Sequence, residues 1–407
     1  MKKSILQKYA NLLAVKGVNV QKGQDVLVVA SLDQPEFVAM VTEALYKAGA
    51  RKVYIDWDYQ PLGKLHVKYQ SIKTLSTVDR LALEKIKWRS EDLPAHLYLV
   101  SDDPDGLKGI NIDKMVKAQQ AKMKIIKPYR DAMESKYQWC IAAVPGKKWA
   151  KKVFPELKVN QAVEKLWESI LTASRVVDDP IAAWNEHNTN IKEKCAILNS
   201  LKLEKLHYQS ANGTNLTVWL NEKGLFHGGF DTTTFGINFN PNIPSEEVFT
   251  SPKAGKAEGI VYSSKPLSYN GQLIDNFYLK FENGKVAGVG AEKNVELLKK
   301  MVSIDEGASM LGECAFVPFD SPINNTGILF YETLFDENAA CHLAIGRGFA
   351  DCIEGGTEMS HEERIKNGIN DSSTHVDFMI GTKDLTVTGT DFNGKEIVIF
   401  KNGNWNI

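Results

Sequence analysis

Residues 24–56 read QDVLVVASLDQPEFVAMVTEALYKAGARKVYID, and their pattern indicates the fold class of the first half of the chain. Its opening run, residues 24–30, has the length and the apolar content of a buried strand. The segment from Pro35 to Lys47 has a helical pattern that ends at Gly49, and residues 52–56 follow as a second strand. A strand, a helix and a strand with short connections predict a βαβ unit and therefore a parallel sheet.

Two further strands are predicted at residues 96–100 and 139–144, with a largely helical segment at 110–133 between them. The loop after the first strand, residues 31–35, lacks the glycines that cradle a phosphate or a dinucleotide. Gly288-Val289-Gly290 is also incomplete as such a fingerprint, and we interpret it as a turn. We therefore expect no nucleotide cofactor.

The composition changes near Asp178-Asp179-Pro180. A helix is predicted at about 181–200, followed by short strands that are separated by turns such as Asn212-Gly213 and Asn283-Gly284. Asn-Gly adopts positive φ at little cost, which favours hairpins. We predict an N-terminal α/β domain with a mainly parallel sheet at 1–180. A C-terminal α+β domain, rich in antiparallel strands and carrying the metal site, is predicted at 181–407.

The charge balance excludes several classes of partner. The 407 residues carry 49 Lys and Arg against 50 Asp and Glu, a net charge of −1, with the basic residues dispersed. This pattern predicts no nucleic-acid partner. We expect no membrane partner, because no window approaches the ~18 apolar residues of a membrane span. The five cysteines are scattered without a C-x-x-C pair and the start lacks a signal-peptide pattern, so we expect a cytoplasmic protein.

Carboxylates and imidazoles recur in four segments of the C-terminal half, which are residues 244–247, 312–313, 337–342 and 370–377. On a strand His375 and Asp377 face the same side, so both could reach one point. Such a nitrogen and oxygen set suits zinc, cobalt or manganese, and magnesium where oxygen dominates. The spacing alone leaves open a second interpretation, in which the histidines are structural and the glutamates are solvated.

The same segments carry a resemblance to a known family. They include residues 242–252 (NIPSEEVFTSP), 320–322 (DSP), 334–346 (LFDENAACHLAIG) and 369–377 (INDSSTHVD). These motifs are similar to those of the M29 metallo-aminopeptidases, the thermophilic aminopeptidase type, and the resemblance covers almost the whole chain. It implies an exopeptidase that acts on peptides with a free N-terminus by means of two divalent metal ions. It also implies a homodimer whose active sites open to an enclosed cavity.

Carried over motif by motif, the resemblance implies a set of metal ligands, which are Glu247, Glu313, His342, His375 and Asp377. Glu337 is a further candidate that either binds metal or orients a ligand. We expect Glu313 to bridge both ions. A carboxylate must also take a proton from the attacking water, and we assign this role to Glu313, with Glu246 and Glu337 as the other choices.

One position departs from the family pattern. The family carries a tyrosine at the metal centre seven residues after the ligand histidine, and this chain has Phe349 there. Phenylalanine cannot coordinate a metal or donate to a developing oxyanion, and loss of one such donor costs about 10²–10³ in kcat. We count Phe349 with the catalytic residues and expect an enzyme that still works, with Arg347 or a water replacing the phenol.

Two alternatives remain open from the sequence. The first is a metal-binding scaffold or regulatory protein that kept the ligands and lost turnover, which Phe349 would favour. The second is a related metal-dependent amidohydrolase that acts on a non-peptide amide. A serine nucleophile is not expected, because the chain has no G-x-S-x-G elbow.

Overall fold

The computed structural model describes residues 1–407. The chain forms two compact units, which are described separately below. The first comprises Met1–Asn185 with Phe230–Pro244, and the second comprises Glu186–Gly229 with Ser245–Ile407. The return of residues 230–244 to the first unit was not foreseen from the sequence, which had suggested one boundary at residue 180.

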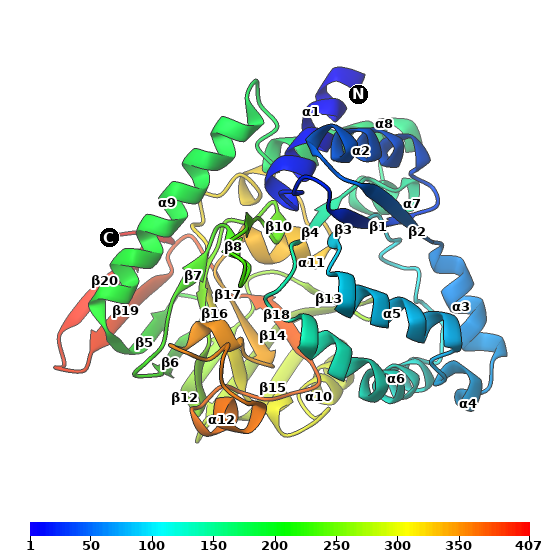
Figure 1. Ribbon diagram of the computed structural model, residues 1–407. Coiled ribbons are helices and arrows are strands. Elements are labelled where there is room, and N and C mark those ends of the chain that lie inside the picture. The colour runs from blue at the N-terminus through cyan, green and yellow to red at the C-terminus, as the bar shows by residue number, and fades with distance from the viewer. The chain divides into compact units, whose positions relative to one another are not determined.

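The first unit is built on a parallel sheet of five strands in the order β10-β4-β3-β1-β2 (Figure 1). These strands are β1 (Asp25–Ser31), β2 (Lys52–Asp58), β3 (Ala95–Val100), β4 (Trp139–Ala143) and β10 (Asn242–Ile243). Every pairing between neighbours is parallel. The predicted βαβ unit and its parallel sheet are thus confirmed. A short antiparallel pair, β8 (Asp231–Thr232) and β9 (Asn238–Phe239), lies in the returning segment.

Eight α-helices belong to the same unit as this sheet. They are α1 (Lys3–Leu12), α2 (Pro35–Ala48), α3 (Gln60–Tyr69), α4 (Ile72–Leu75), α5 (Arg80–Asp92), α6 (Ile112–Met133), α7 (Lys147–Val153) and α8 (Val159–Ala173). Proline stands in the first turn of α2, where its missing N–H has no partner to lose, and Gly49 ends the helix at a φ of 120°. The predicted helix from Pro35 to Lys47, ended by Gly49, is therefore confirmed. The long α9 (Pro180–Leu201) follows, close to the predicted 181–200.

The second unit contains two antiparallel sheets. The nine-stranded one comprises β5 (Leu203–Gln209), β6 (Asn215–Leu220), β12 (Pro252–Tyr262), β13 (Leu267–Tyr269), β14 (Gln272–Glu282), β15 (Lys285–Lys293), β19 (Thr386–Asp391), β20 (Glu396–Lys401) and β21 (Asn404–Trp405). The five-stranded one comprises β7 (His227–Gly228), β11 (Val248–Thr250), β16 (Leu311–Phe316), β17 (His342–Gly346) and β18 (His375–Met379). Short helices α10 (Val295–Met301), α11 (Thr333–Asp336) and α12 (His361–Lys366) lie between strands.

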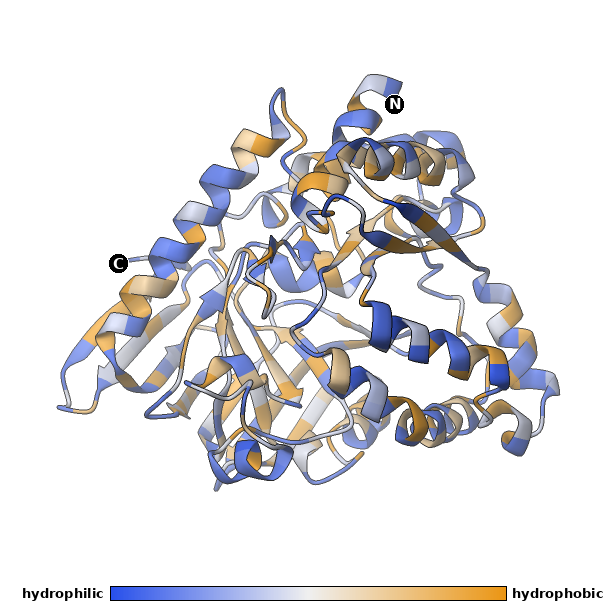
Figure 2. Ribbon diagram, in the orientation of Figure 1, coloured by the Kyte–Doolittle hydropathy of each residue, from blue (hydrophilic) through white to orange (hydrophobic).

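Local sequence explains much of this unit. Asn283 and Gly284 both have positive φ, 51° and 77°, and join β14 to β15 as the Asn-Gly turn predicts. The helix α12 is largely hydrophilic (Figure 2), with Ile365 as its one apolar residue, and it begins with a capping box between Ser360 and Glu363. With a parallel α/β region and a region rich in antiparallel strands, the predicted fold class is confirmed.

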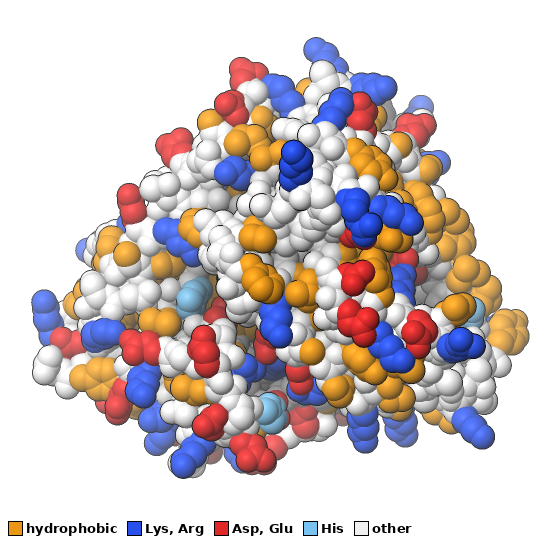
Figure 3. Space-filling view, in the orientation of Figure 1, with side chains coloured by type: hydrophobic (Ala, Val, Ile, Leu, Met, Phe, Trp, Pro, Cys, Tyr) orange, Lys and Arg blue, Asp and Glu red, His pale blue; other side chains and the backbone are white.

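The surface is mixed in charge. On the face shown in Figure 3, the basic and acidic side chains are interspersed. None of the helices combines the length and the apolarity that a membrane span requires.

Candidate metal centre

The five-stranded antiparallel sheet of the second unit places the predicted ligands. Glu247 immediately precedes β11, and Glu313 lies on β16. His342 is the first residue of β17, and His375 and Asp377 lie on β18. We call these five residues the donor cluster. They come from four segments that are adjacent only because β11, β16, β17 and β18 pair in this order.

The strand register puts the donors on one face of the sheet. Glu313 is paired with Ala344, and Ala344 is paired with Asp377, so the three residues form one row across β16, β17 and β18. Side chains directly opposite each other in antiparallel strands project to the same face. His342 lies two residues before Ala344 and shares that face. The small side chain of Ala344 therefore leaves space between the two carboxylates.

The opposite face of the same strands is apolar. Cys314, Leu343, Ile345 and Phe378 alternate with the donors and belong to the hydrophobic core. Because successive residues of a strand face opposite sides, this burial fixes which side the donors face. Cys314 is therefore on the core side. The Cys341 Sγ lies 3.3 Å from the carbonyl oxygen of Val317, which leaves oxygen and nitrogen as the donor atoms.

Backbone carbonyls orient both histidines. The Nδ1 of His342 lies 3.2 Å from the oxygen of Ala340, and the Nδ1 of His375 lies 2.7 Å from the oxygen of Arg347. A carbonyl oxygen only accepts, so we assign the Nδ1 proton in both rings as its donor. The Nε2 atoms then face the cluster, which is the usual arrangement of a metal-binding histidine with its outer partner.

The donor atoms form two groups that share Glu313. Glu247, Glu313 and His342 form one group, and Glu313, His375 and Asp377 form the other, each with its donor atoms within 4.8 Å of one another. In the first group, the Nε2 of His342 lies 3.3 Å from the Oε2 of Glu247. In the second, the Nε2 of His375 lies 3.0 Å from the Oε2 of Glu313 and 3.1 Å from the Oδ1 of Asp377.

The electrostatics are those of crowded, buried carboxylates. Burial raises the pKa of Glu313 to about 7, against the lowering influence of the hydrogen bond from His375. Burial would lower the pKa of His342, but the hydrogen bond and charge of Glu247 outweigh it and raise that pKa to about 9. For His375 the charges of Asp377 and Glu313 likewise overcome burial and raise the pKa. The raised pKa values of Glu313, His342 and His375 mean that these groups bind protons readily.

These residues fit divalent metal ions. Glu247, Glu313 and His342 are 9%, 4% and 1% exposed. Buried charges need partners, since taking an ion out of water costs several kcal/mol. A cation would replace the protons and neutralise the carboxylates, and its donors would be imidazole nitrogen and carboxylate oxygen. That donor set accepts zinc, cobalt, manganese or magnesium.

The two remaining predicted residues lie beside the cluster. Glu337 is outside both groups of donor atoms. Burial, then the charges of Asp377, Glu247 and Glu313, raise its pKa, so it shares their electrostatic environment.

Phe349 contacts the second group. Its ring centroid lies 5.0 Å from that of His375 and 5.5 Å from that of Phe249. The ring that stands where the family has a tyrosine therefore packs against a candidate ligand.

Two residues at the site were not singled out from the sequence. Ala344 separates Glu313 from Asp377, which only the strand register reveals. Asn338 lies inside the quoted motif at 334–346, but its contacts join segments 92 residues apart and leave no local signal.

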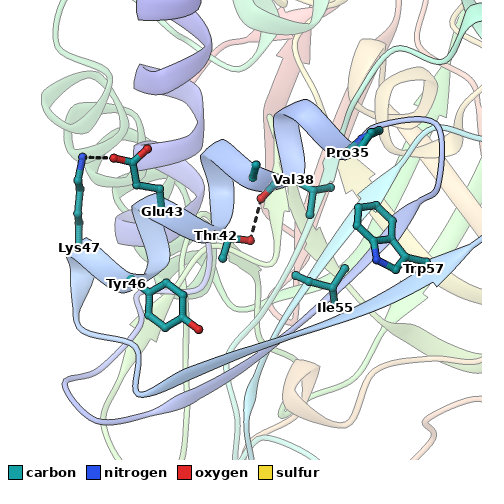
Figure 4. A pocket seen from close by; sticks show the side chains of 9 residues that line it. Pro35, Val38, Thr42, Glu43, Tyr46, Lys47, Ile55 and Trp57 are labelled. Atoms are coloured by element: carbon teal, nitrogen blue, oxygen red, sulfur yellow. Dashed lines mark hydrogen bonds and ion pairs between the residues drawn. The ribbon is translucent and has the colours of Figure 1, made fainter.

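A surface hollow in the first unit lacks this chemistry. It has a volume of about 680 Å³ and lies between α2 and β2, with Val38, Ile55 and Trp57 among its apolar lining residues (Figure 4). Its one carboxylate, Glu43, is paired with Lys47 at 2.6 Å. The donor cluster, rather than this hollow, is therefore the candidate site.

Comparison with known proteins identifies the family to which the chain belongs. Residues 2–405 match the family model of the thermophilic metalloproteases (M29). The chain belongs to the M29 family. Among its relatives, aminopeptidase AmpS of Bacillus subtilis (strain 168) is 43% identical over 402 residues, which is 98% of each chain. Aminopeptidase 2 of Geobacillus stearothermophilus is 40% identical over 98% of this chain and 97% of that protein. The solved structure of wild-type AmpT from Thermus thermophilus matches with a TM-score of 0.92 at 37% identity, over 100% of both chains.

The predicted family and enzyme class are thus confirmed: this M29 member is a peptide-hydrolysing exopeptidase. Membership of a metalloprotease family implies the use of a divalent metal. Neither the silent scaffold nor the amidohydrolase is favoured by relatives that are named aminopeptidases.

Proposed function

We propose that the chain removes the N-terminal residue from peptides with a free N-terminus, with two divalent cations held by the donor cluster. The observation that supports this most directly is the pair of donor groups that share Glu313. Each group contributes one imidazole, whose Nε2 faces the cluster, together with carboxylates. We assign Glu247 and His342 to one cation, His375 and Asp377 to the other, and Glu313 to both.

The protein residues have separate tasks in this proposal. When bound, divalent cations at such a site polarise the scissile carbonyl and lower the pKa of a water molecule. The proton of that water must then reach the leaving amine. Glu313 is our first choice to carry it and Glu337 the second, because Glu313 belongs to both donor groups and Glu337 lies within the influence of the same carboxylates.

Phe349 has a positioning task in the same proposal. Its ring packs on His375, whose other side is held through Nδ1 by the Arg347 carbonyl, so the imidazole is fixed from two directions. The chain then works without the phenol of the family pattern, at a lower rate.

The number of ions, two, is part of this proposal, and zinc, cobalt, manganese and magnesium are the candidate metals. A homodimer and a cytoplasmic location, which the sequence led us to expect, stay predictions.

The proposed function is tested with a panel of aminoacyl anilides and their N-acetylated counterparts. The chain is stripped of metal with a chelator and assayed with and without added cobalt or zinc. We expect anilide release only with metal present and only from substrates with a free amine. The variant His375→Ala should lose this activity. His207→Ala should retain it, because His207 pairs with Thr217 on the other sheet of the unit.

Two outcomes would contradict the proposal. Equal hydrolysis of the acetylated substrates would indicate a general amidohydrolase. Metal binding without any turnover would indicate a silent scaffold, and activity gained by Phe349→Tyr would then identify the lost phenol as the cause.

A further inference from the structure

Asn338 is a fully buried amide next to the donor cluster. It lies in the single 3-10 turn Glu337–Ala339, between α11 and β17. An unpaired amide at such a position would be costly, because a buried polar group loses its bonds to water. The partners of this side chain are therefore informative.

The amide of Asn338 joins two carboxylate-bearing segments. Its Oδ1 accepts the backbone N–H of Glu246 at 2.7 Å. Its Nδ2 donates to the carbonyl oxygen of Leu334 at 3.0 Å and to the Oε1 of Glu337 at 3.3 Å. The orientation of the amide follows from these partners, because a backbone N–H only donates and a carbonyl only accepts.

The Glu246 end of this link matters because residues 245–247 lie outside any strand. They lack the ladder hydrogen bonds that fix the other donors on β16, β17 and β18. The His187 Nε2 holds the carbonyl of Ser245 at 2.7 Å, and Asn338 holds the next residue. Glu247 follows directly and leads into β11, so its reach toward His342 depends on these contacts on one side and on the pairing of β11 on the other.

The Glu337 end matters for a different reason. Glu337 lies outside both donor groups, yet the charges of Asp377, Glu247 and Glu313 act on it. The Nδ2 of Asn338 gives one oxygen of this carboxylate a fixed donor.

We propose that Asn338 is a positioning residue of the metal centre, which sets the main chain before Glu247 through Oδ1 and the carboxylate of Glu337 through Nδ2. This inference rests on the proposed function, since Asn338 aligns two acidic side chains of the same site. Loss of the Oδ1 bond and loss of the Nδ2 bond should have different effects, and two substitutions of Asn338 distinguish them.

Asn338→Asp tests the Nδ2 end. The introduced carboxylate keeps an oxygen toward the N–H of Glu246 but puts its second oxygen against Glu337 in place of a donor. We expect kcat to fall about 10–100-fold, the range found when outer partners of metal ligands are changed, while cobalt affinity stays within about threefold. Unchanged kcat would overturn this part of the proposal.

Asn338→Ala tests both ends, because it also releases the Glu246 backbone. We expect the affinity of the metal-stripped full chain for cobalt to fall about 10–100-fold and the visible spectrum of the bound cobalt to change. The control is Asn199→Ala, which removes a comparable clamp: the amide of Asn199 accepts from the N–H and donates to the carbonyl of Phe226, and it is bonded to neither Glu246 nor Glu337.

Cobalt binding is measured without substrate, so the result distinguishes a failure of the proposed function from a failure of the positioning role of Asn338. A wild-type chain that binds no cobalt would overturn the proposed function itself. A wild-type chain that binds cobalt, with Asn338→Ala and Asn199→Ala giving the same affinity and spectrum as each other, would overturn the positioning role alone. If Asn338→Ala does not fold, the kcat of Asn338→Asp, which keeps the link to Glu246, decides the Nδ2 part of the proposal, and the cobalt affinity of Asn338→Ser, whose shorter side chain releases Glu246, decides the Oδ1 part.

Discussion

We predict that His96 makes the first unit sensitive to acid. It is fully buried on β3, and its Nδ1 lies 3.0 Å from the guanidinium of Arg89 and 3.3 Å from the hydroxyl of Tyr98. A guanidinium only donates, so Nδ1 accepts and the proton is on Nε2. A second proton would have to enter at Nδ1, against Arg89. Burial, then the charges of Arg89 and Lys85, lower the pKa of His96 from 6.5 to about 3.

The sign and size of the effect follow from linkage. Between pH 6.5 and about 3 the unfolded chain binds a proton that folded His96 does not, so stability falls as pH falls through this window. At pH 5, which is one and a half units below the unfolded value, the loss is ~2 kcal/mol at 1.36 kcal/mol per unit. At pH 7.5 the loss is close to zero.

The assay is hydrogen exchange of the β3 amides, read as protection factors at pH 7.5 and pH 5 in the wild-type chain and in His96→Phe. A local probe is needed because a chain of two compact units is not expected to unfold in one step. We expect wild-type protection to drop about 30-fold more than that of the variant, which corresponds to ~2 kcal/mol. Equal pH dependence in the two proteins would show that His96 does not cause the loss of protection.

Three further predictions concern the metal centre. Ala344→Leu should weaken cobalt binding at least tenfold, because the larger side chain enters the space between Glu313 and Asp377, and a cobalt titration of the folded variant would show it. Phe349→Tyr should raise kcat for aminoacyl anilides about tenfold or more with little change in KM, since a hydroxyl donor is restored; an unchanged kcat would count against that role. Cobalt affinity should rise from pH 6 to pH 8, because the metal must displace the protons held by Glu313 (pKa about 7) and His342 (pKa about 9). Binding isotherms that coincide across this pH range would contradict the prediction.

The sequence was most informative where structure is local. The helix from Pro35, the turn at Asn283-Gly284 and the strand at residues 96–100 follow from proline, glycine and apolar patterns, and the structure confirms them. The pairing of His375 with Asp377 also follows from strand periodicity, and their donor atoms lie 3.1 Å apart.

Non-local features could not be predicted in this way. The proximity of Glu313 to His375 depends on the order and register of β16, β17 and β18, which no local pattern encodes. The link from Asn338 to Glu246 spans 92 residues. For the donor set itself, the quoted motifs and their resemblance to the M29 family carried the prediction, since spacing alone left a structural alternative open.

Glu313 is shared by both donor groups, and cobalt stoichiometry measures whether two ions depend on it. The metal-stripped chain is titrated with cobalt while bound metal and anilide hydrolysis are followed together. We expect activity to reach its maximum when two ions are bound per chain, and Glu313→Gln to weaken the binding of both. A maximum at one ion, with Glu313→Gln binding cobalt as tightly as the wild-type chain, would contradict it.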